Sequence, residues 1–537
     1  MPVRADKSSP YGALAFRVFL FFLGFYLSLT RGHFWTTDEV AVFHQTRSLW
    51  EHGNLSTAAL PNTLLGRGGK SYAPYGAGQS ILAIPLYGIG KGVHRLLDSA
   101  GAQSWVQTFA GAPIGDDPER HWGGEVEIFF VGLYNSIAVA ALAALYFAFN
   151  LRLGAAPRWA LAATVLFGLT SYVAGFSASF FQHGSESLFL LWTFYFLFCD
   201  SQNPGWRVRA LAGCTAAMMM LVRVSTLATL PALGLYLLWN IWKRTSKDPA
   251  SPTREAIREI AAFTIPAAAG ILAMAIVNYA KFGIFSVSGS YGRLVPLNNP
   301  LFVGLYGFLF SVGDSIFLFT PLLFLMPWYC AGFVRRYRAE SFAVAGMALS
   351  SLLFYSKAYL WHGQWAFGPR YLAHIVPLLL LPLGLWLQTA KPLAWIAVGA
   401  AGAAGVFIEL LHWLVNVSFV YYHEGYQNFV PEYGFLFLPE SSQIASHWRA
   451  IQAWDNRVDF WLLAVYRVFG TDRLLSIAVP LLLLLVLCAF LVKRQYRSAA
   501  AASEKGIPPS FARGVPDVVY AIALAWLTLI VLVLVVH

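Results

Sequence analysis

Residues 11–30, YGALAFRVFLFFLGFYLSLT, form an apolar run that contains one charged residue, Arg17. As a helix this run would be about 30 Å long, which is enough to cross the hydrocarbon core of a bilayer. Because no short apolar segment with a small-residue cleavage site precedes it, we expect a retained signal anchor. Similar runs recur to the C-terminus. The sequence therefore predicts an all-α, polytopic integral membrane protein.

The composition supports this class. The 537 residues are 58% hydrophobic and 12% charged, whereas a soluble protein carries about 25% charged residues. The net charge of +11 comes from basic residues scattered between apolar runs, a distribution typical of positive-inside topology and contact with anionic lipid rather than of nucleic-acid binding. The four cysteines lie in or beside apolar runs, so we expect buried thiols and no disulfide framework.

We expect about thirteen membrane spans in a single transmembrane domain that covers residues 1–537. They centre near residues 12–30, 127–149, 160–180, 187–200, 209–222, 226–242, 259–279, 314–333, 341–357, 371–389, 393–417, 474–492 and 518–536. Alternate connections between them are basic, which predicts that these connections and the N-terminus face the cytoplasm. The basic connections contain Arg152, Arg158, Arg207, Arg209, Lys243, Arg244, Lys247, Arg335, Arg336, Arg338, Lys493, Arg494 and Arg497.

The opposite side of the membrane receives two long segments, 31–126 and 418–473. The first contains Trp, Tyr and Pro throughout, so we expect a folded loop with helices that lie on the membrane surface. The second contains a short amphipathic stretch near residues 446–454. Residues 493–517 are expected to form a cytoplasmic linker before the last span.

Two acids, Asp38 and Glu39, follow the first span in the segment RGHFWTTDE, residues 31–39. A carboxylate pair where the chain leaves the bilayer can act on a lipid headgroup, although it can also be a solvated helix end. Glu186, in the turn that begins with His183, is another acid at the predicted outer boundary. An ionisable group at that depth is a functional candidate, and the alternative is a helix N-terminal charge favoured by the dipole.

Cationic residues recur on the same predicted side. Arg223 interrupts an apolar stretch, and a guanidinium binds phosphate through two hydrogen bonds; the alternative is a structural salt bridge. The segment 357–371, KAYLWHGQWAFGPRY, places Lys357, His362 and Arg370 beside aromatic residues at one membrane exit. Arg293 ends a glycine-containing turn. These cations are candidates to hold a phosphate.

The segment 72–79, YAPYGAGQ, has the composition of a constrained loop that can approach a ligand. Its alternative interpretation is ordinary turn chemistry.

The motifs in this order resemble the GT-C superfamily of glycosyltransferases, and especially the group of protein O-mannosyltransferases and lipid A aminoarabinose transferases. The resemblance covers most of the chain and fades past residue 418. Its elements are Asp38-Glu39, Ser48-Leu-Trp-Glu-His-Gly53, Gly69-Lys-Ser-Tyr72-Ala-Pro-Tyr-Gly76, Leu221-Val-Arg223, Asn278-Tyr-Ala-Lys-Phe-Gly283 and Phe367-Gly-Pro-Arg370-Tyr371.

The resemblance implies transfer of a sugar from a polyprenyl-phosphate donor. Asp38 would be the base, with Glu39 as its neighbour or as an acceptor contact. The donor phosphate would be held by Arg223, Lys357, His362, Arg370, Tyr371 and Arg293. The acceptor or sugar would contact Glu186, His183, Tyr72, Tyr75 and Gln79. Because polyprenyl phosphate leaves as a stable anion, one base without a general acid suffices, which predicts inversion at the anomeric carbon.

One departure from the family concerns the acceptor. Aminoarabinose transferases would have Lys-Pro-Pro where this chain has Ala73-Pro74-Tyr75. The acceptor therefore stays open between a glycan, a lipid and a protein.

Other functions remain as alternatives. A transporter or flippase would need charges buried at the midplane and repeated halves, and a ligase of lipid-linked glycans would share the architecture. The intramembrane Arg223 disfavours a purely structural scaffold. A divalent metal near Asp38, Glu39 and Glu186 is not favoured, because no ligand spacing demands one, and we expect no cofactor. The expected location is a bacterial inner membrane, with the active site on the periplasmic side.

Overall fold

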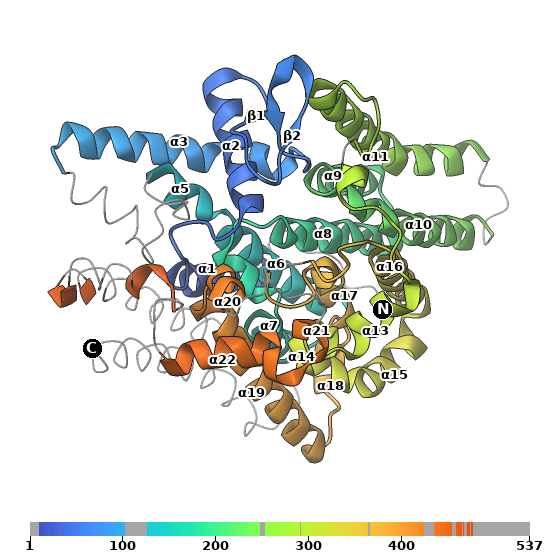
Figure 1. Ribbon diagram of the computed structural model, residues 1–537. Helices are drawn as coiled ribbons and strands as arrows, with labels where there is room; N and C mark the ends of the chain where they lie inside the picture. The colour runs from blue at the N-terminus through green and yellow to red at the C-terminus, as the bar shows by residue number, and fades with distance from the viewer. Residues whose placement is uncertain are drawn as a thin grey trace.

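The computed structural model describes residues 10–102, 126–246, 253–289, 291–363, 366–423, 434–453 and 458–463, with a few single residues up to 479. Helices dominate this part of the chain (Figure 1). The all-α prediction holds except for one small antiparallel sheet in the first long loop. It has the order β1-β3-β2, with β1 at Ser56–Thr57, β2 at Leu64–Leu65 and β3 at Ser71–Tyr72.

Five helices in the described residues are long and apolar enough to cross a membrane. They are Val126–Arg152 (α5 and α6), Val224–Thr245 (η4 and α10), Arg254–Phe282 (within α11), Arg338–Ser356 (α16) and Pro392–Leu414 (α19). Two shorter apolar helices are Gly12–Ser28 (within α1) and Leu301–Phe310 (α13). The prediction of a helical membrane protein is thus supported, whereas the count of about thirteen spans is not confirmed. The predicted spans at 474–492 and 518–536, and the linker at 493–517, lie outside the described residues.

The remaining elements connect these helices. The α-helices are α1 (Pro10–Ser28), α2 (Thr37–His52), α3 (Gly78–Ser99), α5 (Val126–Gly132), α6 (Tyr134–Arg152), α7 (Pro157–Thr170), α8 (His183–Gln202), α9 (Trp206–Val222), α10 (Leu230–Thr245), α11 (Thr253–Phe282), α12 (Tyr291–Leu294), α14 (Ile316–Phe319), α15 (Met326–Arg336), α17 (Val376–Leu379), α18 (Leu383–Leu387), α20 (Val417–His423), α21 (Gly434–Phe437) and α22 (Gln443–Ala453). The 3₁₀ helices are η1 (Arg67–Gly69), η3 (Ala174–Ala178), η4 (Val224–Thr229), η5 (Pro321–Leu325), η6 (Arg370–Ile375) and η8 (Pro439–Ser441).

Three predicted spans are interrupted. The span at 160–180 divides into α7 and η3, the span at 314–333 into α14, η5 and α15, and the span at 371–389 into η6, α17 and α18. In the second and third, prolines at the start of the new segments supply the break, because a proline cannot continue the hydrogen-bond ladder of the preceding turn. Such breaks are tolerated at membrane depth where the freed backbone is buried in protein.

The hairpin of α8 and α9 packs against α11 and defines two ends of the molecule. Helix α9 approaches α11 closely at Gly213 and Gly270, where a Cβ atom would come within 2.4 Å of Phe263 O and 2.5 Å of Ala217 Cα. Small residues permit this approach in membrane helices. Because α8 begins at His183 and α9 ends at Val222, Glu186 and Arg223 share one end, which we call the site end.

Asp200 and Arg209 share the opposite end, which we call the turn end. There Arg209 Nε lies 2.8 Å from Asp200 Oδ2, while Arg209 Nη2 and Arg244 Nη2 lie 3.1 and 2.6 Å from the two oxygens of Glu259. Two connections that the sequence predicts on one side of the membrane, those with Arg209 and with Arg244, therefore lie close together. Which side of the bilayer they face stays a prediction.

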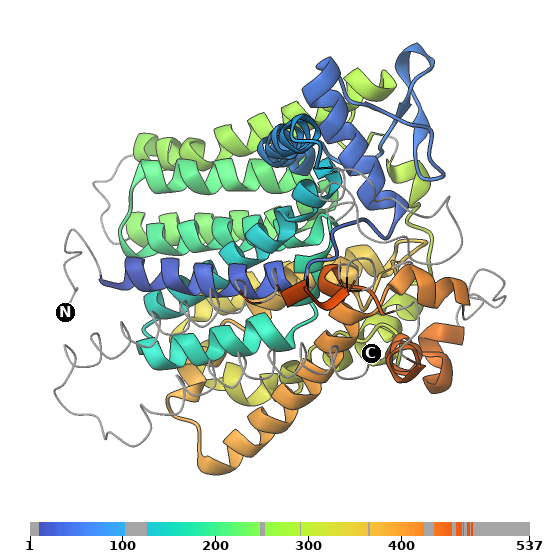
Figure 2. The ribbon, with the colours of Figure 1, turned by 90° about the vertical axis from the view of Figure 1, so that its left-hand side faces the viewer.

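The described part of the first long loop folds into α2, α3 and the small sheet. Helix α3 is seen lengthwise in Figure 1 and end-on in Figure 2, where α1 runs lengthwise, so α3 crosses the direction of α1. A helix that lies on the membrane surface would have this direction. Figure 2 also shows α20 to α22 (orange) at the same end of the helices as α2, so both long loops meet there.

Candidate functional site

Helix α2 begins with a capping box that uses Glu39. Thr36 Oγ1 accepts a hydrogen bond from Glu39 N, and Glu39 Oε2 accepts from the backbone N–H groups of Thr36 and Trp35 at 3.0 and 2.9 Å. The other oxygen, Oε1, accepts from Phe180 N at 2.6 Å, in the loop before α8. Glu39 is buried and engaged by these donors. Its carboxylate thus fixes the start of α2, and a direct acceptor contact stays a prediction.

Asp38, one residue earlier, faces different partners. Its side chain is 26% exposed, and its Oδ2 lies 3.1 Å from Arg370 Nη1. The other oxygen accepts hydrogen bonds from the Tyr75 hydroxyl at 2.5 Å and from Asn62 Nδ2 at 2.9 Å. Burial, together with the adjacent Asp38 carboxylate, raises the pKa of Tyr75 well above its usual value, so this phenol stays protonated and donates. Asp38 is therefore held in one orientation by residues that are distant in sequence.

The loop that carries Tyr75 is held against α9 and α11. At Gly76 a Cβ atom would lie 2.0 Å from Leu221 O, so only glycine allows the loop to approach the end of α9 this closely. Lys281 Nζ donates hydrogen bonds to Ala73 O at 3.1 Å, Tyr75 O at 2.8 Å and Gln45 Oε1 at 2.5 Å. The constrained loop predicted from the sequence is present, and its Tyr75 points at Asp38.

Two other residues of this segment that were predicted to contact a ligand form hydrogen bonds that hold the loop in place. The Tyr72 hydroxyl donates to Arg67 O at 3.2 Å. Gln79 Nε2 donates to Phe180 O at 2.6 Å, and Gln79 Oε1 accepts from Ser185 Oγ at 3.0 Å. These bonds are internal to the protein, and contact of either residue with a sugar or an acceptor stays a prediction.

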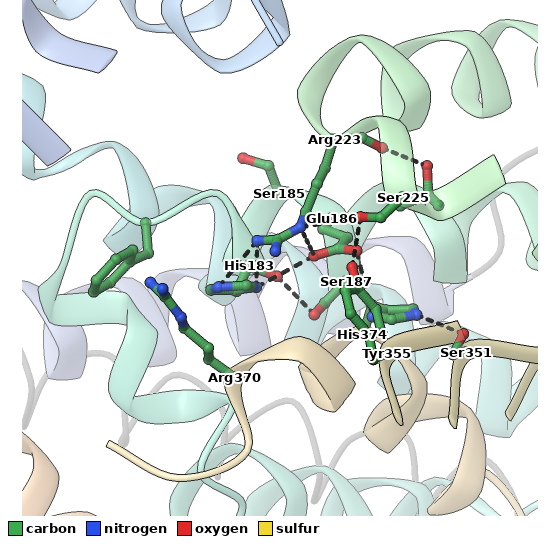
Figure 3. A network of polar contacts seen from close by, with 12 residues as sticks. His183, Ser185, Glu186, Ser187, Arg223, Ser225, Ser351, Tyr355, Arg370 and His374 are labelled. Carbon is green, nitrogen blue, oxygen red and sulfur yellow. Dashed lines mark hydrogen bonds and ion pairs between the residues drawn. The ribbon is translucent and has the colours of Figure 1, made fainter. Parts of the chain in front are cut away.

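Figure 3 shows a buried cluster around Glu186 at the site end. Glu186 Oε2 lies 3.3 Å from His183 Nδ1 and 3.7 Å from Arg223 Nε, and its Oε1 lies 3.4 Å from His374 Nδ1. Arg223 Nη1 lies 3.2 Å from His183 Nε2. The residues of the cluster come from three segments: α8, the break after α9, and η6. Because these segments are far apart in the sequence, no local pattern reveals the cluster.

Tyr371 connects this cluster with the Asp38–Arg370 pair. Its ring stacks on Tyr355 with centroids 4.8 Å apart. The guanidinium carbon of Arg223 lies 4.9 Å from the centroid of the Tyr371 ring, and that of Arg370 lies 5.2 Å from it. At these distances both cations are attracted to the ring. Two arginines therefore share one aromatic side chain at the site end.

Several buried polar atoms here have no hydrogen-bond partner among the described residues. They are Arg370 Nε, Glu186 Oε1 and His374 Nδ1, of which the last two lie 3.4 Å from each other without forming a hydrogen bond. Buried polar atoms are nearly always hydrogen-bonded, and exceptions point to water or a ligand. The site end therefore keeps hydrogen-bonding capacity that the fold does not use, next to two guanidinium groups that can bind an anion.

The structure does not bring every predicted cation to this place. Lys357 ends α16 and is half-buried; among the described contacts, its backbone oxygen accepts from Asn299 N, and its ammonium group joins neither Asp38 nor Glu186. Arg293 lies in α12, and its side chain is outside the described residues. Their proposed role at a phosphate stays a prediction.

His362 is buried beside the rings of Trp361 and Phe435. Burial, reinforced by the positive charge of Arg370, lowers the pKa of His362 to about 4, so its imidazole is neutral near pH 7. The next residue, Gly363, has a φ of 75°, and a Cβ atom there would lie 2.8 Å from Arg370 Cγ. The turn at 362–363 thus makes room for the Arg370 side chain.

No three His, Cys, Asp or Glu side chains gather as metal ligands within the described ranges. Metal independence remains an expectation. Sequence reasoning did not single out Asn62 or His374, and it noted Lys281 as part of the segment 278–283. A signal exists for His374, because it lies four residues after Arg370. Asn62 is found only through contacts between distant segments.

No family model matches the chain, and no curated protein matches it. Two solved structures of ArnT from Cupriavidus metallidurans are similar to it. The apo structure covers 88% of this chain and 71% of its own, at 14% identity and a TM-score of 0.46. The complex with undecaprenyl phosphate covers 93% of this chain and 80% of its own, at 14% identity and a TM-score of 0.43.

Proposed function

We propose that this protein is an inverting membrane glycosyltransferase that moves a sugar from a polyprenyl-phosphate donor to an acceptor. The site end of the helices, where both long loops meet, would face the periplasm. The observation that carries the proposal is the ion pair of Asp38 with Arg370 at 3.1 Å, which places a partly exposed carboxylate beside a guanidinium in a protein with apolar, membrane-length helices.

The cations suit a phosphate. Arg370 and Arg223 both lie against Tyr371, so one phosphoryl group can be approached by two guanidinium groups. Each guanidinium presents a planar fork that matches phosphate oxygens. Positive charge fixed at the leaving group stabilises the negative charge that develops there as the glycosidic bond breaks. This stabilisation replaces the proton that a general acid would supply.

Asp38 would take the proton from the acceptor hydroxyl. In the structure its Oδ2 is engaged by Arg370 and its Oδ1 by Tyr75 and Asn62. A carboxylate oxygen that contacts a guanidinium is not free to accept a proton from the acceptor. Arg370 would shift toward the donor phosphate when the donor binds, which leaves Oδ2 available to the acceptor. Attack from the side of Asp38, opposite the phosphate, gives inversion at the anomeric carbon.

No observation among the described residues specifically favours the alternative that the protein is a transporter. It needs charged groups at the bilayer midplane, whereas Glu186 and Arg223 lie at one end of the α8–α9 hairpin and Asp200 and Arg209 at the other.

The test uses cells with and without the protein, and mass spectrometry of their envelope glycans, lipids and proteins. We expect one sugar modification to depend on the protein. Asp38→Asn should lower that modification by at least about 100-fold, the scale of a lost general base, while the protein remains inserted and folded. Wild-type modification by the Asp38→Asn protein would contradict the proposal, as would a translocated substrate with no covalent sugar transfer.

A further inference from the structure

We propose that Asp459, which the second long loop supplies, is a positioning residue that sets the orientation of Asp38 through His33 and Trp35. This inference rests on the proposed function, and it adds a residue more than 400 positions away in sequence to the catalytic machinery. The described part of the second loop would then be a functional component of the site rather than a cover over it.

Asp459 is buried and engages three side chains from two segments. Its carboxylate lies 2.9 Å from His33 Nε2, accepts from Trp35 Nε1 at 2.7 Å and accepts from Asn416 Nδ2 at 3.3 Å. The backbone continues the connection, because Asp459 N donates to Leu414 O and Trp461 N donates to Thr30 O. The segment between α1 and α2 is therefore held on both of its sides by the second loop.

Trp35 transmits this restraint to the catalytic helix. Its indole N–H is bound by Asp459, and its backbone N–H donates to Glu39 Oε2 at 2.9 Å, which is the oxygen that caps α2. Ser418 Oγ donates to Trp35 O at 2.6 Å. Asp38 lies in the first turn of α2, so any rotation of Trp35 moves the helix start that carries Asp38. A displacement of about 1 Å at a reacting group can cost about 100-fold in rate.

Three ionisable side chains, Arg31, His33 and Asp459, lie around the Trp35 indole. Arg31 is buried, with its guanidinium carbon 2.9 Å from the centroid of the Trp35 ring and its Nη2 donating to His412 O at 2.9 Å. His33 faces Asp459, the nearby positive charge of Arg31 and the carbonyl oxygen of Phe34. Asp459 faces His33 and Arg31. Glu39 also attracts Arg31, so two carboxylates, Glu39 and Asp459, balance two bases in a buried position.

The charges predict how the contact depends on pH. Burial opposes the charged form of His33, but the Asp459 carboxylate outweighs it and raises the pKa of His33. Burial likewise opposes ionisation of Asp459, but His33 lowers the pKa of this carboxyl. The ion pair therefore forms at a pH below the raised pKa of His33 and above the lowered pKa of Asp459, and it is lost as the pH rises through the pKa of His33. The restraint that the His33–Asp459 pair places on Trp35 should therefore weaken at a pH above the pKa of His33.

The first experiment measures transfer by the full-length protein as a function of pH. Asp459→Asn keeps the size of the side chain and removes its charge. It should lower kcat by about 10- to 100-fold, leave the donor KM little changed and move the alkaline limb of the kcat profile to lower pH. His33→Gln should remove that limb. Asp98→Asn, another outer-loop acid beside a histidine at 3.6 Å, is the matched control and should change neither quantity. An unchanged kcat and profile in Asp459→Asn would overturn the inference.

The second experiment does not require transfer activity, so it separates failure of this inference from failure of the proposed function. The rate at which a maleimide labels the introduced thiol of the Asp38→Cys protein is measured by peptide mass, with and without Asp459→Asn. We expect labelling at position 38 to become several-fold faster when it is measured at a temperature below the melting transitions in detergent of both proteins. Equal labelling rates would show that Asp459 does not set the orientation of this position.

Discussion

The two ends of the α8–α9 hairpin carry buried charges that are organised in different ways. At the turn end, Arg209 contacts both Asp200 and Glu259, and Arg244 contacts the second oxygen of Glu259. Asp200 also accepts from Gly205 N at 2.9 Å. At the site end, Glu186 has an oxygen without a hydrogen-bond partner among the described residues, as His374 has a nitrogen.

From this difference we infer that the turn end is a structural cluster and that the site end is available to a ligand. A buried salt bridge offsets its desolvation cost only when its remaining hydrogen bonds are satisfied. At the turn end all four carboxylate oxygens of Asp200 and Glu259 have a partner, although Arg244 Nη1 has none among the described residues. At the site end a carboxylate oxygen itself lacks a hydrogen bond, as occurs at functional sites. Similar residue types at the two ends of one hairpin therefore have opposite meanings.

The largest effect should come from Arg223→Gln at the site end. Loss of this guanidinium removes positive charge from the leaving phosphate, so kcat/KM should fall by about 100-fold or more. Binding of sugar-free polyprenyl phosphate to the purified protein should weaken in parallel, because the phosphate contact exists before reaction. A loss of stability with unchanged phosphate binding would instead assign Arg223 to the same structural class as Arg209.

Arg209→Gln is the matched variant at the turn end. It leaves Asp200 buried without its closest cation, although Arg244 Nη1 remains 3.9 Å away. The free energy of unfolding should decrease by about 3 kcal/mol, the lower end for a broken buried ion pair. The thermal transition in detergent measures this loss. Weaker binding of polyprenyl phosphate by the folded variant would contradict the division between the two ends.

The lowered pKa of His362 predicts that the stability of the folded protein decreases in acid. Because burial and Arg370 lower the pKa of His362 to about 4, the unfolded chain takes up a proton at higher pH than the folded protein does. The folded state therefore loses stability as the pH falls from 6.5 toward 4. His362→Gln should recover about 2 kcal/mol of the stability that the wild type loses between pH 7 and pH 5. Melting temperatures at these two pH values test it, and equal acid losses in both proteins would contradict it.

The smallest effect should come from Arg370→Lys. Lysine keeps the positive charge but loses the planar fork that contacts Asp38, so affinity for polyprenyl phosphate should fall by about 10-fold. Arg335→Lys, in the last turn of α15, is the control and should have no effect. An equal decrease in both variants would argue against a specific contact at Arg370.

Much of the frame could be predicted from the sequence, because apolar runs of membrane length and alternating basic connections report the physical environment directly. Residues 127–149 were predicted as a span and lie within α5 and α6. The spans at 314–333 and 371–389 were predicted as continuous and broke into short segments, since hydropathy does not register the backbone effect of a proline inside an apolar run.

The site could be predicted in part. Asp38, Arg223 and Arg370 were chosen because charge at a membrane boundary is costly, and the structure brings these three to the same end. The separation of Asp38 from Glu39 was not foreseen, although Thr36-Thr-Asp-Glu39 matches a capping box. Asp459 carries no local signal, because His33 and Trp35 lie more than 400 residues earlier and only the tertiary fold brings them to it.

The hydrogen bonds of Lys281 link a membrane-length helix to Asp38, the proposed base. Helix α11 has 30 residues, so it is about 45 Å long, which exceeds the hydrocarbon thickness and makes its tilt responsive to lipid length. Its Lys281 binds the carbonyl oxygens on either side of Pro74, and Tyr75 in turn holds Asp38. Lipid chain length should thereby tune the turnover rate, as a thicker or thinner bilayer pulls on the hydroxyl that orients the base.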